Sequence, residues 1–177
     1  MELNILRNTI TAIVILIISY GSVALLNLDT PNTNQITRKV SLVPVLDKNK
    51  LLTLIANGQQ VLFVDAREQE EFDEEHIPGA KKILLRDINQ NTLKEIGPAD
   101  VVVAYCLKDF RGFEVAKALH NIGVKNVYTM KNPGLNGWKS NKLPTVRMGA
   151  IETNQEIEYL VKFSKKYIKN TNRDSRI

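Results

Sequence analysis

The chain has 177 residues, one Cys, two His and a formal net charge of +5. This length fits one domain of common size with additional segments. The positive charge is not gathered in one block or interleaved with aromatic residues, so we expect no nucleic-acid partner. A single Cys excludes an internal disulfide, and one Cys with two His leaves too few soft ligands for a structural zinc site. We therefore expect neither a metal nor a cofactor.

The first segment, residues 1–28, contains a long uncharged run. Residues 8–28 include no charged side chain, and most of them are Ile, Leu, Val or Ala. At about 1.5 Å per residue this run forms a helix of about 31 Å, against about 30 Å for the hydrocarbon core of a bilayer. The run predicts a single transmembrane helix. A cleavable signal peptide is the alternative, with residues 10–18 as its apolar core and the small residues 22–24 as its cleavage site.

The charges that flank this run bear on its orientation. Arg7 precedes the run and Asp29 follows it directly, which keeps the N-terminus inside and places the remaining chain on the outer, periplasmic face of the membrane. A cleaved signal peptide would also deliver the domain to the periplasm. Positive charge near a transmembrane helix favours the cytoplasmic side, and Arg38 and Lys39 lie close enough to the run to count. A domain that faces the cytoplasm therefore stays open as an alternative.

A linker and then a domain follow. Residues 29–40 are polar, include Pro31 and form the linker, and the domain is predicted to span residues 41–147. Apolar runs and helical spacing predict an alternation of strands and helices, which is typical of an α/β fold of three layers around a mostly parallel sheet. The predicted strands are residues 41–46, 61–65, 83–85, 101–105 and 126–130, and the predicted helices are residues 48–56, 68–74, 89–96 and 112–123.

The last segment, residues 148–177, is predicted to form an additional amphipathic helix. Thr153 and Glu156 have the spacing of a capping box, and apolar residues follow at helical intervals. Lys side chains gather toward its C-terminal end, as the helix dipole prefers. The simpler interpretation is a helix packed on the domain with a solvated Lys face. The alternative is a basic helix that touches anionic lipid.

Cys106 lies where a predicted strand gives way to a helix. The free backbone N–H groups and the dipole at the start of a helix favour an anion, whether a thiolate or a bound substrate group. Lys108 and Arg111 add positive charge beside it. These neighbours predict a reactive thiolate, and an inert buried Cys is the alternative.

Four segments of this domain resemble the rhodanese family. The six residues from Cys106 to Arg111 are similar to the family's active-site loop, with Cys first and Arg last. Residues 61–72 resemble a family strand with its Asp-x-Arg, and residues 76–80 resemble its His-Ile-Pro-Gly-Ala. Residues 127–138 resemble its closing Gly-Gly-x-x-x-Trp segment. The four motifs occur in family order and imply a rhodanese-like fold.

This resemblance implies a sulfurtransferase that works by double displacement. The Cys106 thiolate would take sulfane sulfur from thiosulfate, polysulfide or another persulfide, and a thiol or cyanide acceptor would then remove it. The amides of residues 107–111 would cradle the persulfide. Lys108 and Arg111 would steer an anionic donor. Leu107, Asp109 and Phe110 complete the expected substrate-binding set.

Other polar residues of the domain are expected to have structural roles. Asp65 and Arg67 are predicted to brace loops, with ion pairs to Glu70 or Glu71. His76 is predicted to be structural rather than a general base. The acidic residues from 68 to 75 lack the spacing of a metal site and are expected to form a solvated face.

Two residues depart from the family pattern and keep alternatives open. Asp109 stands where many members have Gly, and its carboxylate should repel an anionic donor. Pro133 replaces one Gly of the Gly-Gly pair. A non-catalytic sulfur-binding or interaction module at the membrane is therefore an alternative function. A phosphatase or arsenate reductase of the Cys-x5-Arg type is less favoured, because only four residues separate Cys106 from Arg111.

Overall fold

The computed structural model describes residues 43–130 and 134–174. The described residues belong to one of the two units into which the chain divides, Ser41–Ile177. The predicted transmembrane segment and the linker lie outside the described residues, as does Pro133. Within the described ranges, no helix is both long and apolar enough to span a bilayer.

The described elements alternate along the chain between strands and helices, as the sequence predicts. In chain order they are β1 (Val45–Leu46), α2 (Lys48–Ala56), β2 (Val61–Asp65), α3 (Gln69–Glu74), β3 (Lys81–Lys82), the 3-10 helix η2 (Leu85–Asp87), α4 (Thr92–Ile96), β4 (Val101–Tyr105), α5 (Phe110–Asn121), β5 (Val127–Met130), α6 (Gly134–Ser140) and α7 (Thr153–Asp174).

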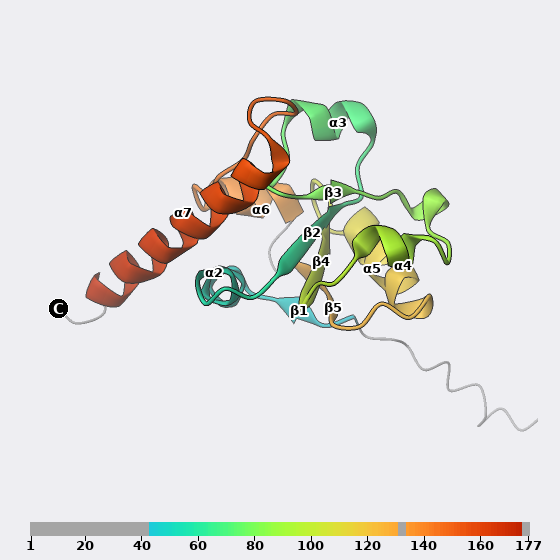
Figure 1. Cartoon of the computed structure of the whole chain (residues 1–177), viewed down its shortest axis with the longest axis horizontal. Helices are drawn as coiled ribbons and strands as arrows, with labels where there is room; N and C mark the ends of the chain where they lie inside the picture. Colours follow the sequence, from blue (N-terminus) through green and yellow to red (C-terminus); the bar gives the residue numbers. More distant parts are fainter. Residues whose placement is uncertain (1–42, 131–133, 175–177) are drawn as a thin grey trace, which may run out of the picture. The chain divides into compact units, whose positions relative to one another are not determined.

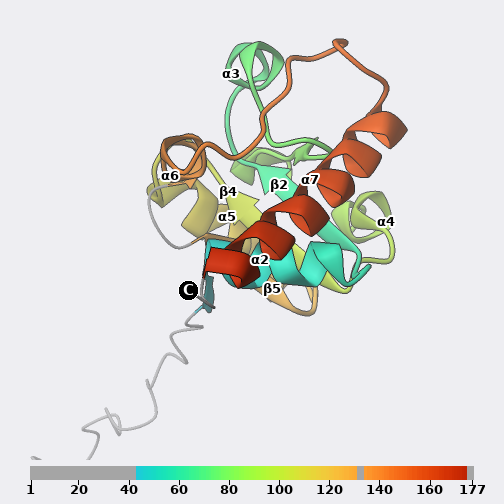
Figure 2. The same ribbon diagram turned by 90° about the vertical axis from the view of Figure 1, so that its left-hand side faces the viewer.

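The strands form one parallel, five-stranded sheet in the order β1-β5-β4-β2-β3. β4 is the central strand, and all five of its residues pair with β2 on one side. A central parallel strand is covered on both faces and must be apolar throughout, and β4 is buried at every position. Figures 1 and 2 show the helices on both faces of the sheet. The predicted α/β class with a parallel sheet is confirmed.

Successive residues of β4 pack into two separate cores, because side chains of a strand alternate between its faces. Val103 and Tyr105 enter the core formed with α2, α6 and α7. Val102 and Ala104, and then Cys106, enter the core formed with α5. The thiol is therefore positioned by the strand register on the α5 side of the sheet.

Three elements have the bounds that the sequence predicts. The helix at 48–56 and the strands at 61–65 and 101–105 are confirmed to the residue. Asp47 caps α2 as an Ncap residue should, since its side chain accepts a hydrogen bond of 2.8 Å from the Asn49 amide.

The strand predicted at 83–85 is wrong. The strand in this region is β3, Lys81–Lys82, and Leu85–Asp87 forms a 3-10 helix. β3 pairs only with the end of β2, so it is an edge strand, and edge strands carry charge rather than apolar residues. The apolar Ile83 and Leu84 are buried in the short segment between β3 and η2.

Three helices start at different residues than predicted, and α6 was not predicted. α3 begins at Gln69, one residue later than expected, because Glu68 is its N-cap. α5 begins at Phe110, so Arg111 belongs to its first turn. α4 begins at Thr92 because Asn89 makes a side-chain turn with the Asn91 amide, at 2.8 Å. α6 contains two Gly residues, which have low helix propensity, and its helical spacing was therefore not evident from the sequence.

The C-terminal helix α7 packs along α2, which confirms a helix docked on the domain. Leu160 and Ser164 are buried in this contact. The capping box predicted for Thr153 and Glu156 is wrong, since Thr153 is already helical and Glu156 is buried. The Glu156 carboxylate instead accepts a hydrogen bond of 2.9 Å from the Gly79 amide, across the domain.

Candidate active site

Cys106 follows β4 at the carboxyl edge of the sheet, where open parallel sheets bind ligands. The residue is free and only 3% exposed. The next three residues, Leu107 to Asp109, are exposed and form the loop that leads to α5. A reagent must therefore reach the sulfur through the surface of this loop.

Glycines hold the backbone of this loop from two sides. Gly134 has a φ of +47°, and a Cβ there would overlap the carbonyl oxygens of Cys106 and Lys108, so only Gly fits. The next two amides, of Leu135 and Asn136, donate to the carbonyls of Cys106 and Leu107 at 2.8 and 3.1 Å. The start of α6 therefore fixes the first half of the loop.

Gly112 brings α5 against the end of β4. A Cβ on Gly112 would lie 2.8 Å from Tyr105 Cα, closer than real side chains approach. The first turn of the helix can therefore pack directly on the strand end beside Cys106. Sequence reasoning used Gly112 only as a helix start and did not identify its packing role.

The loop amides are available to an anion. Among the described residues, the amides of Leu107, Lys108 and Asp109 donate to no backbone carbonyl. The first amides of α5 also have no partner within their own helix, and the helix dipole adds partial positive charge. A negative charge on the Cys106 sulfur would lie beside these donors.

Arg111 is engaged by Glu71 of α3. Its two terminal nitrogens donate to the two carboxylate oxygens at 2.7 and 2.9 Å. These hydrogen bonds lower the pKa of Glu71 and raise that of Arg111. The ion pair predicted between Arg67 and Glu70 or Glu71 is wrong, since Arg67 pairs with Asp65 and Glu71 pairs with Arg111. The observed pair ties α3 to the start of α5 across the mouth of the loop.

Asp65 and Arg67 form a buried pair at the end of β2. The Arg67 guanidinium donates to both Asp65 oxygens, at 2.7 to 3.1 Å, and also to the Glu75 carbonyl. Burial opposes the charge on Arg67, but Asp65 outweighs it and the pKa of Arg67 is raised. Burial, with Asp65 nearby, raises the pKa of Tyr105 well above its usual value. The pair thus braces both ends of α3.

His76 is buried beneath α3 and α7. Its Nδ1 lies 2.8 Å from the Phe72 carbonyl oxygen, and its ring stacks on Phe72 with centroids 4.0 Å apart. Its Nε2 lies 3.5 Å from the Glu156 carboxylate. These contacts join the end of α3 to α7, and they involve no residue of the Cys106 loop.

The surface beside the loop is apolar with charged borders. Phe110 is 77% exposed and Leu85 is 50% exposed. They border a hollow of about 290 Å³, which also includes Arg111 and Glu68. Glu68 pairs with Arg86 at 2.7 Å at the rim. This hollow was not predicted from the sequence, because the strand was expected at residues 83–85 and the 3-10 helix η2 was not expected.

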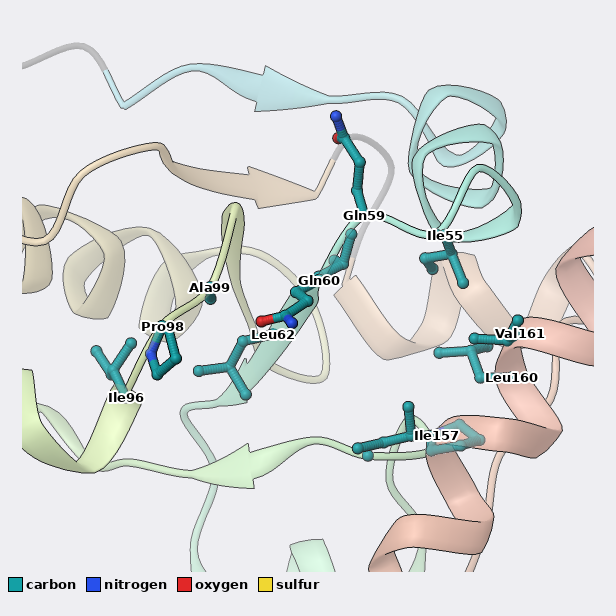
Figure 3. Close-up of a pocket in the computed structure, with 14 residues that line it drawn as sticks. Ile55, Gln59, Gln60, Leu62, Ile96, Pro98, Ala99, Ile157, Leu160 and Val161 are labelled. Carbon is teal, nitrogen blue, oxygen red and sulfur yellow. The ribbon is translucent and has the colours of Figure 1, made fainter.

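A separate hollow of about 380 Å³ lies between β2 and α7. In Figure 3, Leu62, Ile157 and Leu160 lie around it, and Gln59 and Gln60 are among its polar residues. None of its lining side chains is titratable or nucleophilic. The chemistry therefore belongs to the Cys106 loop and not to this hollow.

The described part of the chain holds no candidate metal site. Among the residues that the structure describes, no three His, Cys, Asp or Glu side chains lie together as metal ligands. Two acidic residues of this segment are instead engaged by cations, since Glu71 of α3 pairs with Arg111 and Glu75, which follows α3, pairs with Lys139.

The family-model comparison identifies the class of protein. The model described as "Rhodanese-like domain" matches residues 47–141, more than half of the chain. The chain therefore belongs to the rhodanese-like domain family. The matched residues include the whole Cys106 loop and α6, whereas α7 lies beyond them.

Individual relatives cover part of the chain. "Uncharacterized protein slr1261" of Synechocystis sp. is 32% identical over 98 residues, which are 55% of this chain and 54% of that protein. This chain thus spans about half the length of its curated relative. The BH2092 protein of Bacillus halodurans is 25% identical, with a TM-score of 0.53 over 60% of this chain and 79% of that one.

A thiosulfate sulfurtransferase of Pseudomonas aeruginosa also has a similar structure. It is 15% identical, with a TM-score of 0.53, and the match covers 75% of this chain and 28% of that one. At this identity the likeness shows the fold alone.

Proposed function

We propose that the protein is a rhodanese-type sulfurtransferase that carries sulfane sulfur on Cys106. The observation that carries this proposal is the placement of its one Cys. Cys106 ends the central strand, its neighbours present backbone amides that donate to no backbone carbonyl among the described residues, and α5 begins four residues later. Membership of the rhodanese-like family supports the same chemistry.

The proposed reaction has two displacements at sulfur. The Cys106 thiolate attacks the outer sulfur of a donor such as thiosulfate, the donor S–S bond breaks, and sulfite leaves with the bonding electron pair. The resulting Cys106 persulfide carries its negative charge beside the amides of the loop and of α5. A thiol or cyanide acceptor then attacks the terminal sulfur, and the electron pair of the second S–S bond returns to Cys106.

The loop side chains have distinct proposed roles. Glu71 uses two of the five N–H groups of Arg111, and the remaining ones can bind an anionic donor. Lys108 is exposed and steers the donor toward the loop. Leu107 and Phe110 form the apolar surface that the acceptor meets, and Asp109 weakens the attraction of anions.

Asp65, Arg67 and His76 are proposed as structural support. Their contacts fix α3, whose Glu71 engages Arg111. None of the three is assigned a step in the reaction. In this proposal their replacement lowers activity by moving α3 and does not change the chemistry.

The protein is further proposed to be held at the membrane by residues 8–28, with the domain on the outer face. The uncharged run and its flanking Arg7 and Asp29 support this location. A cleaved signal peptide and a cytoplasm-facing domain are the outcomes that would replace it.

Turnover by the full-length chain, purified in detergent, tests the function. Thiosulfate or polysulfide is supplied with cyanide, and thiocyanate is measured. We expect turnover by the wild type and none by Cys106→Ser, which keeps nearly the same shape but removes the thiolate. Cleavage of an aryl phosphate without sulfur transfer would indicate a phosphatase. Absence of both activities in folded protein would favour a non-catalytic module.

A further inference from the structure

The exposed side of α7 carries a continuous stripe of positive charge. The residues of this cationic stripe are Lys162, Lys165, Lys166, Lys169 and Arg173, and all five are exposed. At 100° per residue they fall within about 100° around the helix axis. None of them takes part in an ion pair among the described residues. No carboxylate occurs between the first and the last of them.

The opposite charge gathers around α3. Residues 68–75 include six carboxylates, and the Glu71–Arg111 pair holds this acidic segment beside the catalytic loop. In both Figure 1 and Figure 2 the C-terminal end of α7 lies far from α3 within the domain. The described domain is therefore electrostatically polar, with the Cys106 loop at its acidic end and the cationic stripe toward the other end.

We propose that the cationic stripe rests on a membrane surface that contains anionic phospholipid, with the Cys106 loop turned away from that surface. A helix face with four to eight Lys and Arg residues attracts anionic lipid strongly enough to hold a segment at the surface. An apolar side of α7 is packed against the domain, where Leu160 is buried and Val161 and Ile168 are partly buried. The contact is therefore electrostatic and does not insert the helix into the bilayer, as a free amphipathic helix would.

The chain that precedes the domain favours a membrane as the occupant. Residues 29–40 can extend by about 40 Å at most, so an anchor at residues 8–28 keeps the domain near the bilayer. Such a tether raises the effective concentration of lipid around the stripe, and a weak contact suffices. The linker enters the domain at the amino end of β1, whereas Cys106 lies at the carboxyl edge of the same parallel sheet. The tethered end of the domain and the Cys106 loop therefore lie at opposite edges of the sheet. This inference rests on the proposed anchor and not on sulfur transfer.

Lysine acylation in lipid nanodiscs tests this inference on the full-length chain. One set of discs contains phosphatidylcholine alone, and the other an equal share of phosphatidylglycerol. We expect mass spectrometry to show several-fold slower acylation of Lys165 and Lys169 in the anionic discs, and high salt should remove the difference. Lys139, which pairs with Glu75 near α3, should be acylated equally in both.

Paired variants separate charge from other effects of substitution. K162Q/K166Q should lower the ratio of docked to undocked protein about thirtyfold, so that Lys165 and Lys169 lose their protection. K162R/K166R keeps the charge and should keep the protection. Equal acylation in both kinds of disc, or full protection in K162Q/K166Q, would overturn the proposal.

Two further outcomes identify which proposal has failed. Stronger protection of the stripe by a short RNA than by anionic lipid would replace the membrane as its partner. Recovery of the protein outside both kinds of disc would overturn the anchor and this inference with it. Thiocyanate production in the same discs reports on the sulfurtransferase independently, since the stripe contains no residue of the catalytic loop.

Discussion

Replacing Gly134 by Ala tests whether α6 fixes the backbone of the Cys106 loop. The added Cβ overlaps the carbonyl oxygens of Cys106 and Lys108, which must retreat by about 1 Å, and a displacement of that size costs about 10²-fold in rate. The positive φ of +47° adds about 1 kcal/mol for an L-residue. With about 1–3 kcal/mol for overpacking, we expect a total loss of about 2–4 kcal/mol in the free energy of unfolding.

Gly149→Ala is the matched control. Gly149 also has a positive φ, of +74°, but a Cβ there meets nothing within 4 Å. This control should lose only about 1 kcal/mol and retain full activity. Urea unfolding and thiocyanate production measure the two effects. Wild-type turnover in Gly134→Ala, or equal losses in both variants, would refute the proposed role of α6.

Three further predictions concern charge and location. Arg111 lowers the pKa of Glu71, so this pair stabilises the fold fully above pH 4.5 and progressively less as the pH falls through the lowered pKa. In urea unfolding, Glu71→Gln should therefore lose about 0.5–1 kcal/mol at pH 7 and match the wild type in acid; a loss independent of pH would contradict this. Asp109→Gly should speed persulfide formation from thiosulfate, most at low ionic strength, and Arg111→Ala should slow it; unchanged stopped-flow rates in both would show that neither charge acts on the donor. The full chain should sediment with membranes and resist carbonate extraction, and release of a soluble protein that begins near Leu25 would indicate signal cleavage instead.

Local sequence signals predicted much of the framework. The apolar run of β4 and the Asp47 cap of α2 act over a few residues, and both were assigned with the observed bounds. β3 was misplaced because an edge strand of two Lys residues has no apolar pattern. The start of α5 was placed late because Phe110 and Arg111 were assigned to the loop, although both are helical.

Long-range contacts of the site could not be predicted in the same way. The partners Glu71 and Arg111 are 40 residues apart in sequence, and several acidic neighbours offered equally plausible pairings. The contact of Gly134 with the Cys106 loop depends on how β4 and β5 lie side by side. Glu156 has the spacing of a capping residue, but the fold places it against Gly79 and His76. Tertiary packing outweighs the local preference in each case.

The mass of the Cys106 peptide after donor treatment tests the central claim most directly. The full-length protein is incubated with thiosulfate or polysulfide, separated from the donor without reductant, and digested for peptide mass spectrometry. The account predicts one added sulfur atom on the Cys106 peptide, removed by cyanide with release of thiocyanate. If Cys106 stays unmodified in folded protein after treatment with thiosulfate and also after treatment with polysulfide, the account is contradicted.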